Sequence, residues 1–223
     1  MFKHQHPYPP FIPEGTKKLI VGTLPPPRFT TRELKPDDVD FCYGSRDGQL
    51  WKILEKIFEV ELLYDNSLEA KRQRVELLKT HHIGVCDMVE VAYRDIEKVN
   101  AADLGILEPK LRPLIPILKE HSSVQTLLFT GGNSKNGPEY FFRKHLREYP
   151  EIDFIRVSDT VPRIHQFNLD SRIIKTVSLT APSGSANRAV GSMALYKKMK
   201  EENPDMDTID FRVLQYMPYF KPG

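Results

Sequence analysis

The apolar segment Leu19 to Val21 ends abruptly at Gly22-Thr23, and three consecutive prolines, Pro25 to Pro27, follow almost at once. Proline fixes φ and has no N–H to donate, so this stretch cannot continue as a paired strand. A buried strand that ends in a stiff loop is how an α/β sheet presents functional groups at its carboxyl edge. The alternative is a plain surface connection, but loops as long as residues 22–48 are uncommon in compact domains and are often functional. We therefore expect this loop to form part of a binding or catalytic site.

The composition is that of an ordinary globular protein. The 223 residues are 40% apolar and 28% charged, with a net charge of +2, which argues against a polycationic tail but allows a local basic face. The length suits a single domain, residues 1–223. Within it we expect an extended N-terminal arm over residues 1–16 and an irregular C-terminal segment over residues 203–223. His4 and His6 share one side of the arm and could pair on a metal, but we expect them to be solvated.

Cysteine content and hydropathy indicate a cytoplasmic protein. Cys42 and Cys86 form no disulfide framework, fit a reducing compartment and lack metal-site spacing. No apolar run approaches the ~18–20 residues that span a bilayer. The N-terminal residues also lack the apolar core of a signal peptide. We expect no metal, no cofactor and no membrane partner, and we expect a monomer.

Hydrophobic periodicity predicts alternating strands and helices. Apolar residues recur at three- and four-residue spacing around Trp51, which predicts a helix over 49–59 with Trp51 as a core anchor. The near-continuous apolar run at 83–89 predicts a strand buried on both faces. Further helices are expected over 67–80, 109–121, 138–148 and 186–202, further strands over 17–23, 124–130, 154–157, 173–179 and 211–215, and a loop over 92–102.

This order of elements predicts an α/β fold with a mainly parallel sheet and helices on both faces. In such a sheet, three unusual loops, 22–48, 131–137 and 180–188, would meet along one edge. The middle loop, which begins Gly131-Gly132-Asn133, lies between a strand and a helix. That arrangement directs backbone N–H groups at an anion or polar ligand, although the spacing is not that of a dinucleotide fingerprint.

Five segments resemble the uracil-DNA glycosylase superfamily, most closely its hypoxanthine-DNA glycosylase-like branch, and they occur in the order of that family. They are HPYPPFIPEGTKKLIVGTLPPPRF, FCYGSRDGQLWKIL, IGVCDMVEVAYRDI, LLFTGGNSKNG and VSLTAPSGSANRAVG, and together they span most of the chain. The resemblance implies a three-layer α/β/α sandwich with a mainly parallel central sheet. It also implies a monofunctional DNA glycosylase that hydrolyses the N-glycosidic bond of a flipped base and leaves an abasic site.

The resemblance implies roles for residues of the first loop. In such proteins this loop holds the catalytic water, which places Gly22 and Thr23 beside the reacting base. One position departs from the pattern, because Gly48 stands where the closest branch has an asparagine, immediately after Asp47. Either Asp47 takes over water activation, or the activity or substrate differs from that branch. A carboxylate can orient water and stabilise an oxocarbenium-like sugar, so Asp47 is the catalytic candidate.

Substrate-binding and DNA-binding residues also follow from the resemblance. Leu24 lies beside the base pocket, Phe41 or Tyr43 stacks on the base, and Asn133 reads its polar edge; Gln49 belongs to the same substrate-binding set. The last loop presses into the minor groove, holds phosphate and fills the gap in the duplex. Its DNA-binding candidates are Pro182, Ser183, Gly184, Ser185, Asn187 and Arg188.

Several carboxylates have a structural alternative. Asp47 could cap the Trp51 helix as well as, or instead of, activating water. Asp87 interrupts an apolar strand and needs partners, so it either caps local backbone or lines the site. The cluster Asp37, Asp38 and Asp40 is expected to face solvent.

The remaining candidates also have structural alternatives. Asn133 could be a turn residue before a helix, and Ser185 could be the N-cap of the helix at 186–202. One of Phe41 and Tyr43 could pack in the core.

Three functions stay open. The first is a glycosylase acting on a deaminated, damaged or modified base, either in repair or against foreign DNA such as phage DNA. A lyase activity would need an activated lysine, and Lys135 is the one lysine in the three loops that could serve. The second is a glycosylase-like DNA-binding module that no longer cuts. The third is a small-molecule enzyme that holds a nucleotide phosphate at Gly131–Asn133, which predicts no salt-dependent duplex binding.

Overall fold

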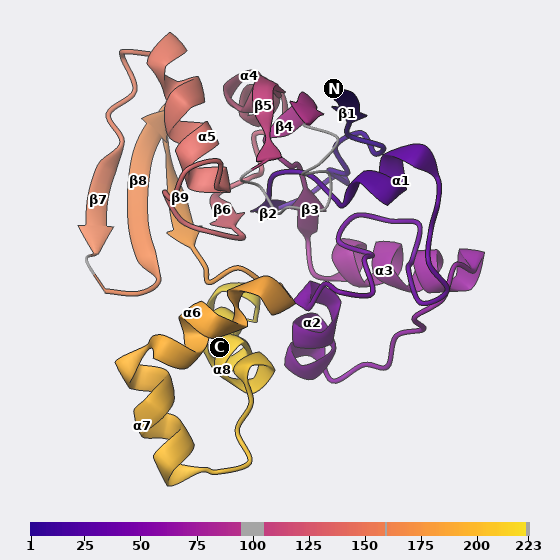
Figure 1. Ribbon diagram of the computed structural model, residues 1–223. Coiled ribbons are helices and arrows are strands. Elements are labelled where there is room, and N and C mark those ends of the chain that lie inside the picture. Colours follow the sequence, from indigo (N-terminus) through magenta and orange to yellow (C-terminus); the bar gives the residue numbers. More distant parts are fainter. Residues whose placement is uncertain (95–104, 159, 222–223) are drawn as a thin grey trace.

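The computed structural model describes residues 1–94, 105–158 and 160–221. Their centre is a six-stranded sheet in the order β3-β2-β6-β9-β8-β7. The four strands β3 (Ile83–Val85), β2 (Lys18–Val21), β6 (Thr126–Phe129) and β9 (Arg172–Ser178) run parallel. The last two, β8 (Arg163–Leu169) and β7 (Ile155–Ser158), continue the sheet in antiparallel fashion (Figure 1).

The buried strands divide their side chains between two cores, as the two-residue period of a strand requires. On one face Ile20 and Leu128 pack against α2 (Leu50–Phe58), α3 (Leu68–Thr80) and α8 (Thr208–Phe220). On the other face Leu19 and Phe129 pack against α4 (Leu114–Glu120) and α5 (Pro138–His145). The prediction of a three-layer α/β/α fold with a mainly parallel sheet is therefore confirmed.

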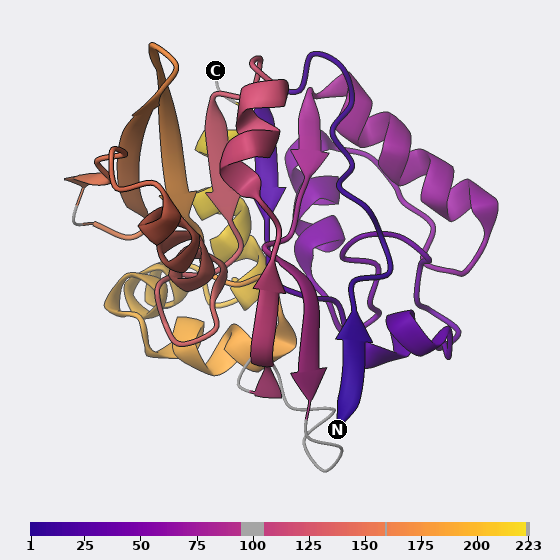
Figure 2. The ribbon, with the colours of Figure 1, turned by 90° about the horizontal axis from the view of Figure 1, so that it is seen from above.

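A second, three-stranded antiparallel sheet lies beside the first, in the order β1-β4-β5 (Figure 2). It joins β1 (Phe2–Gln5) to β4 (Val89–Arg94) and β5 (Leu107–Leu111). The first residues are thus paired strand and not a free arm, and His4 and His6 are buried. The expectation that these histidines are solvated was wrong, because the arm is covered by its strand partner.

Several predicted boundaries were wrong in the middle of the chain. The strand expected over 83–89 is two strands, because β3 ends at Val85 and β4 begins in the other sheet. The helix expected over 109–121 begins only at Leu114, after β5. The loop expected over 92–102 fails at its start, since β4 reaches Arg94, and its residues from 95 onward lie outside the described residues.

Strand β8 was not predicted from the sequence. Its inward-facing residues His165, Phe167 and Leu169 alternate correctly, but the polar residues between them obscured the pattern. The helix expected over 138–148 ends as a short 3₁₀ turn at Leu146–Glu148. The helix expected over 186–202 is a 3₁₀ turn at Gly184–Ala186, then α6 (Asn187–Ser192) and α7 (Ala194–Glu202).

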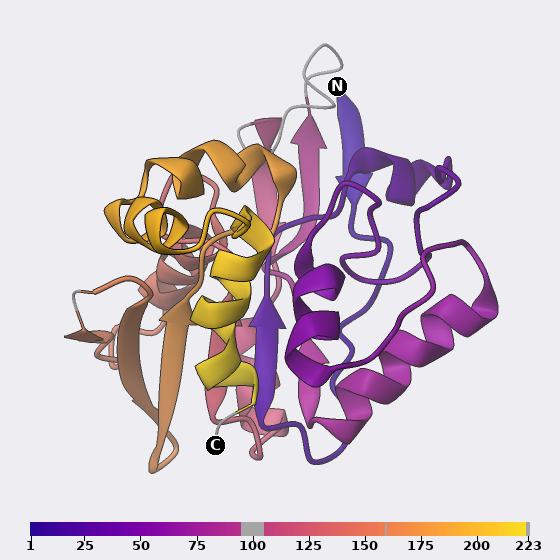
Figure 3. The ribbon, with the colours of Figure 1, turned by 90° about the horizontal axis from the view of Figure 1, so that it is seen from below.

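The largest error in the predicted secondary structure lies in the C-terminal segment. Residues 203–223 were expected to be irregular with a strand at 211–215, yet Thr208–Phe220 is the helix α8. Asp207 starts it, because its carboxylate accepts the N–H groups of Ile209 and Asp210 at 2.7 and 2.8 Å in a capping box. Figure 3 shows α8 lying beside α2 along the sheet.

Candidate functional site

A cavity of about 640 Å³ opens at the carboxyl edge of the main sheet. A residue after each parallel strand lines it: Asp87 after β3, Thr23 after β2, Thr130 after β6 and Ala181 after β9. The triple proline Pro25–Pro27 forms part of the wall. Parallel strands bring the loops at their carboxyl ends together. Two of the three predicted loops, 22–48 and 180–188, meet at this edge as expected, whereas no residue of the middle loop, 131–137, is among the residues that line the cavity.

The carboxylate of Asp87 is buried at this cavity and accepts three hydrogen bonds. Oδ1 accepts from the backbone N–H of Gly22 at 2.8 Å and from the hydroxyl of Tyr43 at 2.9 Å. Oδ2 accepts from Nε2 of His6 at 2.9 Å. Burial acts to raise the pKa of Asp87. The hydrogen bond and the electrostatic attraction from His6, together with the hydrogen bond from Tyr43, outweigh burial and hold this pKa below its usual value. Asp87 therefore both caps local backbone and lines the site, which joins the two roles that the sequence left open.

The contacts of His6 fix its tautomer. Its Nδ1 accepts the backbone N–H of Tyr8 at 3.1 Å, so the ring proton is on Nε2 and is donated to Asp87. The hydroxyl of Tyr8 donates to Oδ1 of Asp40 at 2.6 Å. His6 and Tyr8 both line the cavity, so the N-terminal residues support its floor and one wall.

Tyr43 stands over this floor in a left-handed backbone conformation, with φ of 58°. Its hydroxyl oxygen also lies 3.3 Å from Oγ1 of Thr130. Burial, followed by the charge of Asp87, raises the pKa of Tyr43, so the hydroxyl stays protonated and donates. There is no room for a side chain at Gly22, because a Cβ would lie 2.2 Å from the Tyr43 hydroxyl. Glycine at this position lets the ring approach the strand end.

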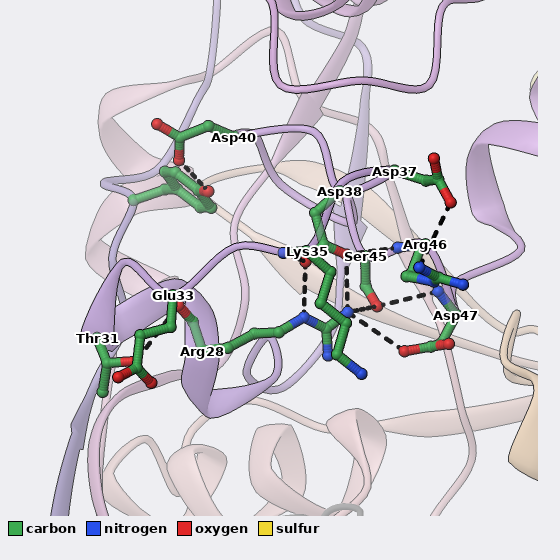
Figure 4. A network of polar contacts seen from close by, with 11 residues as sticks. Arg28, Thr31, Glu33, Lys35, Asp37, Asp38, Asp40, Ser45, Arg46 and Asp47 are labelled. Atoms are coloured by element: carbon green, nitrogen blue, oxygen red, sulfur yellow. Dashed lines mark hydrogen bonds and ion pairs between the residues drawn. The ribbon is translucent and has the colours of Figure 1, made fainter.

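A buried ion pair shapes the opposite wall (Figure 4). Arg28 donates from Nε and Nη2 to the two carboxylate oxygens of Asp38, each at 2.7 Å. The same Nη2 donates to Oγ of Ser45 at 2.8 Å and to Oδ2 of Asp47 at 3.2 Å. Asp38 also accepts the backbone N–H groups of Lys35 and Arg46, at 2.8 Å each. The long first loop is therefore closed on itself, and Arg28 orients the carboxylate of Asp47.

The first and last loops are joined directly. Gly48 and Ser183 form an isolated antiparallel bridge, and the N–H of Gln49 donates to the carbonyl of Pro182 at 2.9 Å. Beyond the junction, the hydroxyls of Ser183 and Ser185 lie 3.0 Å apart. Asp47 thus stands on one wall and the serines on the adjoining wall of a single cavity.

The structure brings many of the predicted site residues together. The cavity is lined by Thr23, Leu24, Tyr43, Asp47, Pro182, Ser183, Gly184 and Ser185. Gly22 lies behind this surface and acts through its N–H to Asp87.

Other predicted residues lie outside the cavity lining. Phe41 is buried and packs edge-on against Phe11, so it is a core residue. Tyr43 is then the remaining candidate for stacking on a base. Asn133 is exposed on the middle loop and does not line the cavity. The side chains of Gln49 and Asn187 accept hydrogen bonds from one arginine, Arg212.

Arg188 is exposed on α6 and does not line the cavity, so its DNA-binding role stays a prediction. Three structural alternatives are corrected. Asp47 does not cap α2, whose N-cap is Gln49 without a side-chain hydrogen bond. Ser185 is not an N-cap, because it lies within the 3₁₀ turn that precedes α6. The expected solvent exposure holds for Asp37 but fails for Asp38, which is fully buried against Arg28.

Arg28 and His6 were not predicted as site residues, yet both line the cavity. Arg28 follows the triple proline directly, and a buried carboxylate such as Asp38 requires a cationic partner, so its neighbourhood held a usable signal. His6 gave no such signal, because its partner Asp87 lies 81 residues away in the sequence.

The described residues contain neither a metal-type cluster of side chains nor a helix that could cross a membrane. Over 1–94, 105–158 and 160–221, no three histidine, cysteine, aspartate or glutamate side chains gather as they would around a metal ion. None of the helices in those same ranges has both the length and the apolar character needed to cross a membrane.

Comparison with known proteins gives a structural match. No protein-family model matches the chain, and no curated protein matches it. Among solved structures, it is similar to the solution NMR structure of a "putative Uracil DNA glycosylase" from Methanosarcina acetivorans. The two are 15% identical with a TM-score of 0.54, over 95% of this chain and 99% of the other. The chain has a uracil-DNA glycosylase-like fold. This likeness concerns the fold alone.

Proposed function

We propose that this protein is a monofunctional DNA glycosylase that hydrolyses the N-glycosidic bond of a flipped base. The observation that carries the proposal is that the Asp47 carboxylate, the Tyr43 ring and the Ser183–Ser185 turn line one cavity. Base excision needs these three elements: a group that supports the sugar cation, a surface that stacks the base, and a loop that grips the strand. The named function of the similar structure agrees with this assignment.

In the proposed reaction the N-glycosidic bond between the base and C1′ breaks, and the sugar gains oxocarbenium character. Asp47 orients the attacking water and stabilises the developing positive charge. Arg28 orients this carboxylate through its 3.2 Å contact. The water adds to C1′, its proton passes to solvent or to the departing base, and an abasic site remains.

Asp87 has a supporting role in this account. Its two oxygens are engaged by Gly22, Tyr43 and His6, so it serves as an acceptor that fixes the cavity floor. Tyr43 offers its ring to the base, since aromatic stacking contributes ~1–3 kcal/mol per base. The partner is DNA, and the expected location is the cytoplasm. The reaction needs no metal or cofactor in this scheme.

A second candidate is a DNA-binding module with the same fold that no longer releases a base. The observation in its favour is Gly48, which replaces the asparagine expected from the resemblance. Both candidates predict duplex binding that weakens steeply as salt rises. Only the glycosylase predicts a free base.

The proposal is tested by base release from a panel of oligonucleotides carrying uracil, hypoxanthine, xanthine, hydroxymethylcytosine or glucosylated hydroxymethylcytosine. Alkaline cleavage of the product strand reports an abasic site, and strand breakage without alkali would instead indicate a lyase. Release of a deaminated base would assign a repair role, whereas release of a hypermodified base would assign action against foreign DNA. Salt-dependent binding with no release from any member would favour the binding module.

A further inference from the structure

Side chains of helix α8 bind the backbone of the last loop, and they bind both the N–H and the carbonyl group of Thr180. The N–H of Thr180 donates to Oε1 of Gln215 at 2.8 Å. The carbonyl of Thr180 accepts from the hydroxyl of Tyr216 at 2.5 Å. The next carbonyl, that of Ala181, accepts from Nε of Arg212 at 2.9 Å. Residues 212, 215 and 216 share one helix face, so α8 presents a continuous docking strip to this loop.

Arg212 extends the contact to the other wall. Its Nη1 donates at 2.9 Å both to Oε1 of Gln49 and to Oδ1 of Asn187. Its Nη2 lies 3.4 Å from the carbonyl of Ser183. Gln49 follows the Asp47-Gly48 pair on the first loop, whereas Ser183 and Asn187 belong to the last loop. One guanidinium therefore contacts both the first and the last loop.

The surroundings of Arg212 are unusual for a charged group. Its side chain is fully buried, and no carboxylate among the described residues forms an ion pair with it, although the charge of Asp207 acts on it from a greater distance. Burying an unpaired charge is costly, so its acceptors must replace water. All of them are neutral carbonyl or amide oxygens, and the planar fork of an arginine reaches acceptors on separate segments at once. A lysine has one ammonium and could not bridge them.

We propose that Arg212 is the positioning residue that locks the strand-gripping loop, residues 180–187, to the wall that carries Asp47, with Gln215 and Tyr216 completing the grip of α8. The proposal rests on the proposed function only for its ligand, a DNA strand. It gives the C-terminal helix a direct part in the site although no residue of α8 lines the cavity.

The test compares Arg212→Met and Arg212→Lys with Arg172→Met. Arg172 is a matched control, because it also binds backbone carbonyls, those of Leu118, Ser122 and Val124, but at the start of β9. Hydrogen exchange follows the N–H groups of Gln49 and Ala186, which donate to Pro182 and Ser183. Duplex affinity and base release are measured on the same samples.

Both Arg212 variants should raise exchange at these two amides and weaken duplex binding by about tenfold, the equivalent of one lost hydrogen-bonded contact to a charged group. Amides of β2 and β6 should keep their protection, and Arg172→Met should bind DNA as the wild type does. Wild-type duplex affinity in Arg212→Lys would overturn the proposal, since a positive charge without the arginine fork would then be enough to support DNA binding. Unchanged exchange at Gln49 and Ala186 would overturn it as well.

A milder pair covers the case in which the Arg212 variants do not fold. Tyr216→Phe removes the hydroxyl that binds Thr180. Tyr219→Phe removes a hydroxyl from the same helix, on a ring that packs against Lys175 of β9. Faster exchange around Thr180 and weaker DNA binding in the first variant alone support the proposal, and equal behaviour contradicts it. If the wild type neither binds DNA nor releases a base, the proposed function fails, while hydrogen exchange still decides the role of Arg212.

Discussion

The hydroxyl of Tyr43 donates to Oδ1 of Asp87 across 2.9 Å, although the two residues are 44 positions apart in the sequence. This bond ties the ring on the first loop to the floor between β3 and β4. Because Asp87 also accepts from Gly22 and His6, three separate segments are fixed to one carboxylate. The position of the proposed stacking ring is therefore set by the fold.

Tyr43 offers a prediction that separates its ring from its hydroxyl. Tyr43→Leu should weaken binding of the flipped base by roughly 10- to 100-fold, because a stacked base is worth ~1–3 kcal/mol. Tyr43→Phe keeps the ring and should lose much less affinity. Binding of both variants to an oligonucleotide with the released base provides the measurement. Equal losses in the two variants would argue against stacking.

Gly22 should not tolerate even a methyl group. In Gly22→Ala the new Cβ would lie 2.2 Å from the Tyr43 hydroxyl and 2.8 Å from Oδ1 of Asp87, so the ring must move. A displacement of ~1 Å in a site can cost about 100-fold in rate, and we expect a loss of that order in single-turnover base release. Gly132→Ala is the control, since nothing lies within 4 Å of a Cβ there. Similar rates for the two variants would contradict this account of the floor.

Asp38 should matter for stability more than its exposed neighbour Asp37. Asp38→Asn removes the charge that faces the Arg28 fork and should lower the free energy of unfolding by about 3 kcal/mol, as breaking buried pairs does. Asp37→Asn should change it by less than about 0.5 kcal/mol, because its contact with Arg46 is exposed. Urea unfolding of both variants decides the matter. A small effect at Asp38 would mean that the loop does not depend on the pair.

His4 predicts a pH dependence of stability. Burial, with the charge of Arg94, lowers the pKa of His4 from 6.5 to about 3 in the folded protein. The unfolded chain therefore binds the proton more readily, and folding stability is lost as pH falls from 6.5 toward 3. The steepest loss from one such group is about 1.4 kcal/mol per pH unit. His4→Gln should show a shallower decline than the wild type in this range, and parallel declines would contradict the assignment.

The amount that could be predicted from sequence differs between the sheet and the site. The strand Lys18–Val21, the Trp51 helix and the loops after β2 and β9 follow from local apolar patterns and from proline and glycine chemistry. The pairing of His6 with Asp87 could not be predicted, because it depends on a contact between distant segments. The helix α8 was also not predicted, and it contains Pro218, a residue that weakens a helical pattern in a sequence.

The site residues show the same division. Asp47, Thr23 and the Ser183–Ser185 turn were placed by motif position and do line the cavity. Phe41 and Tyr43 could not be separated in advance, because both are aromatic and lie two residues apart. The structure buries Phe41 in the core and places Tyr43, with φ of 58°, at the cavity. The role of Arg212 could not be predicted from the sequence, because it depends on the packing of α8 against the last loop.

The most direct test of the account is single-turnover release of free base, measured chromatographically, by the wild type and by Asp47→Asn. The account predicts that the wild type releases a base from one of the panel oligonucleotides. It also predicts that Asp47→Asn binds this oligonucleotide with similar affinity but releases the base at least about 100-fold more slowly, as expected for loss of a catalytic group. Base release that survives the substitution unchanged would contradict the role of Asp47. Absence of release by the wild type from every oligonucleotide, with binding retained, would contradict the proposed glycosylase activity on these bases.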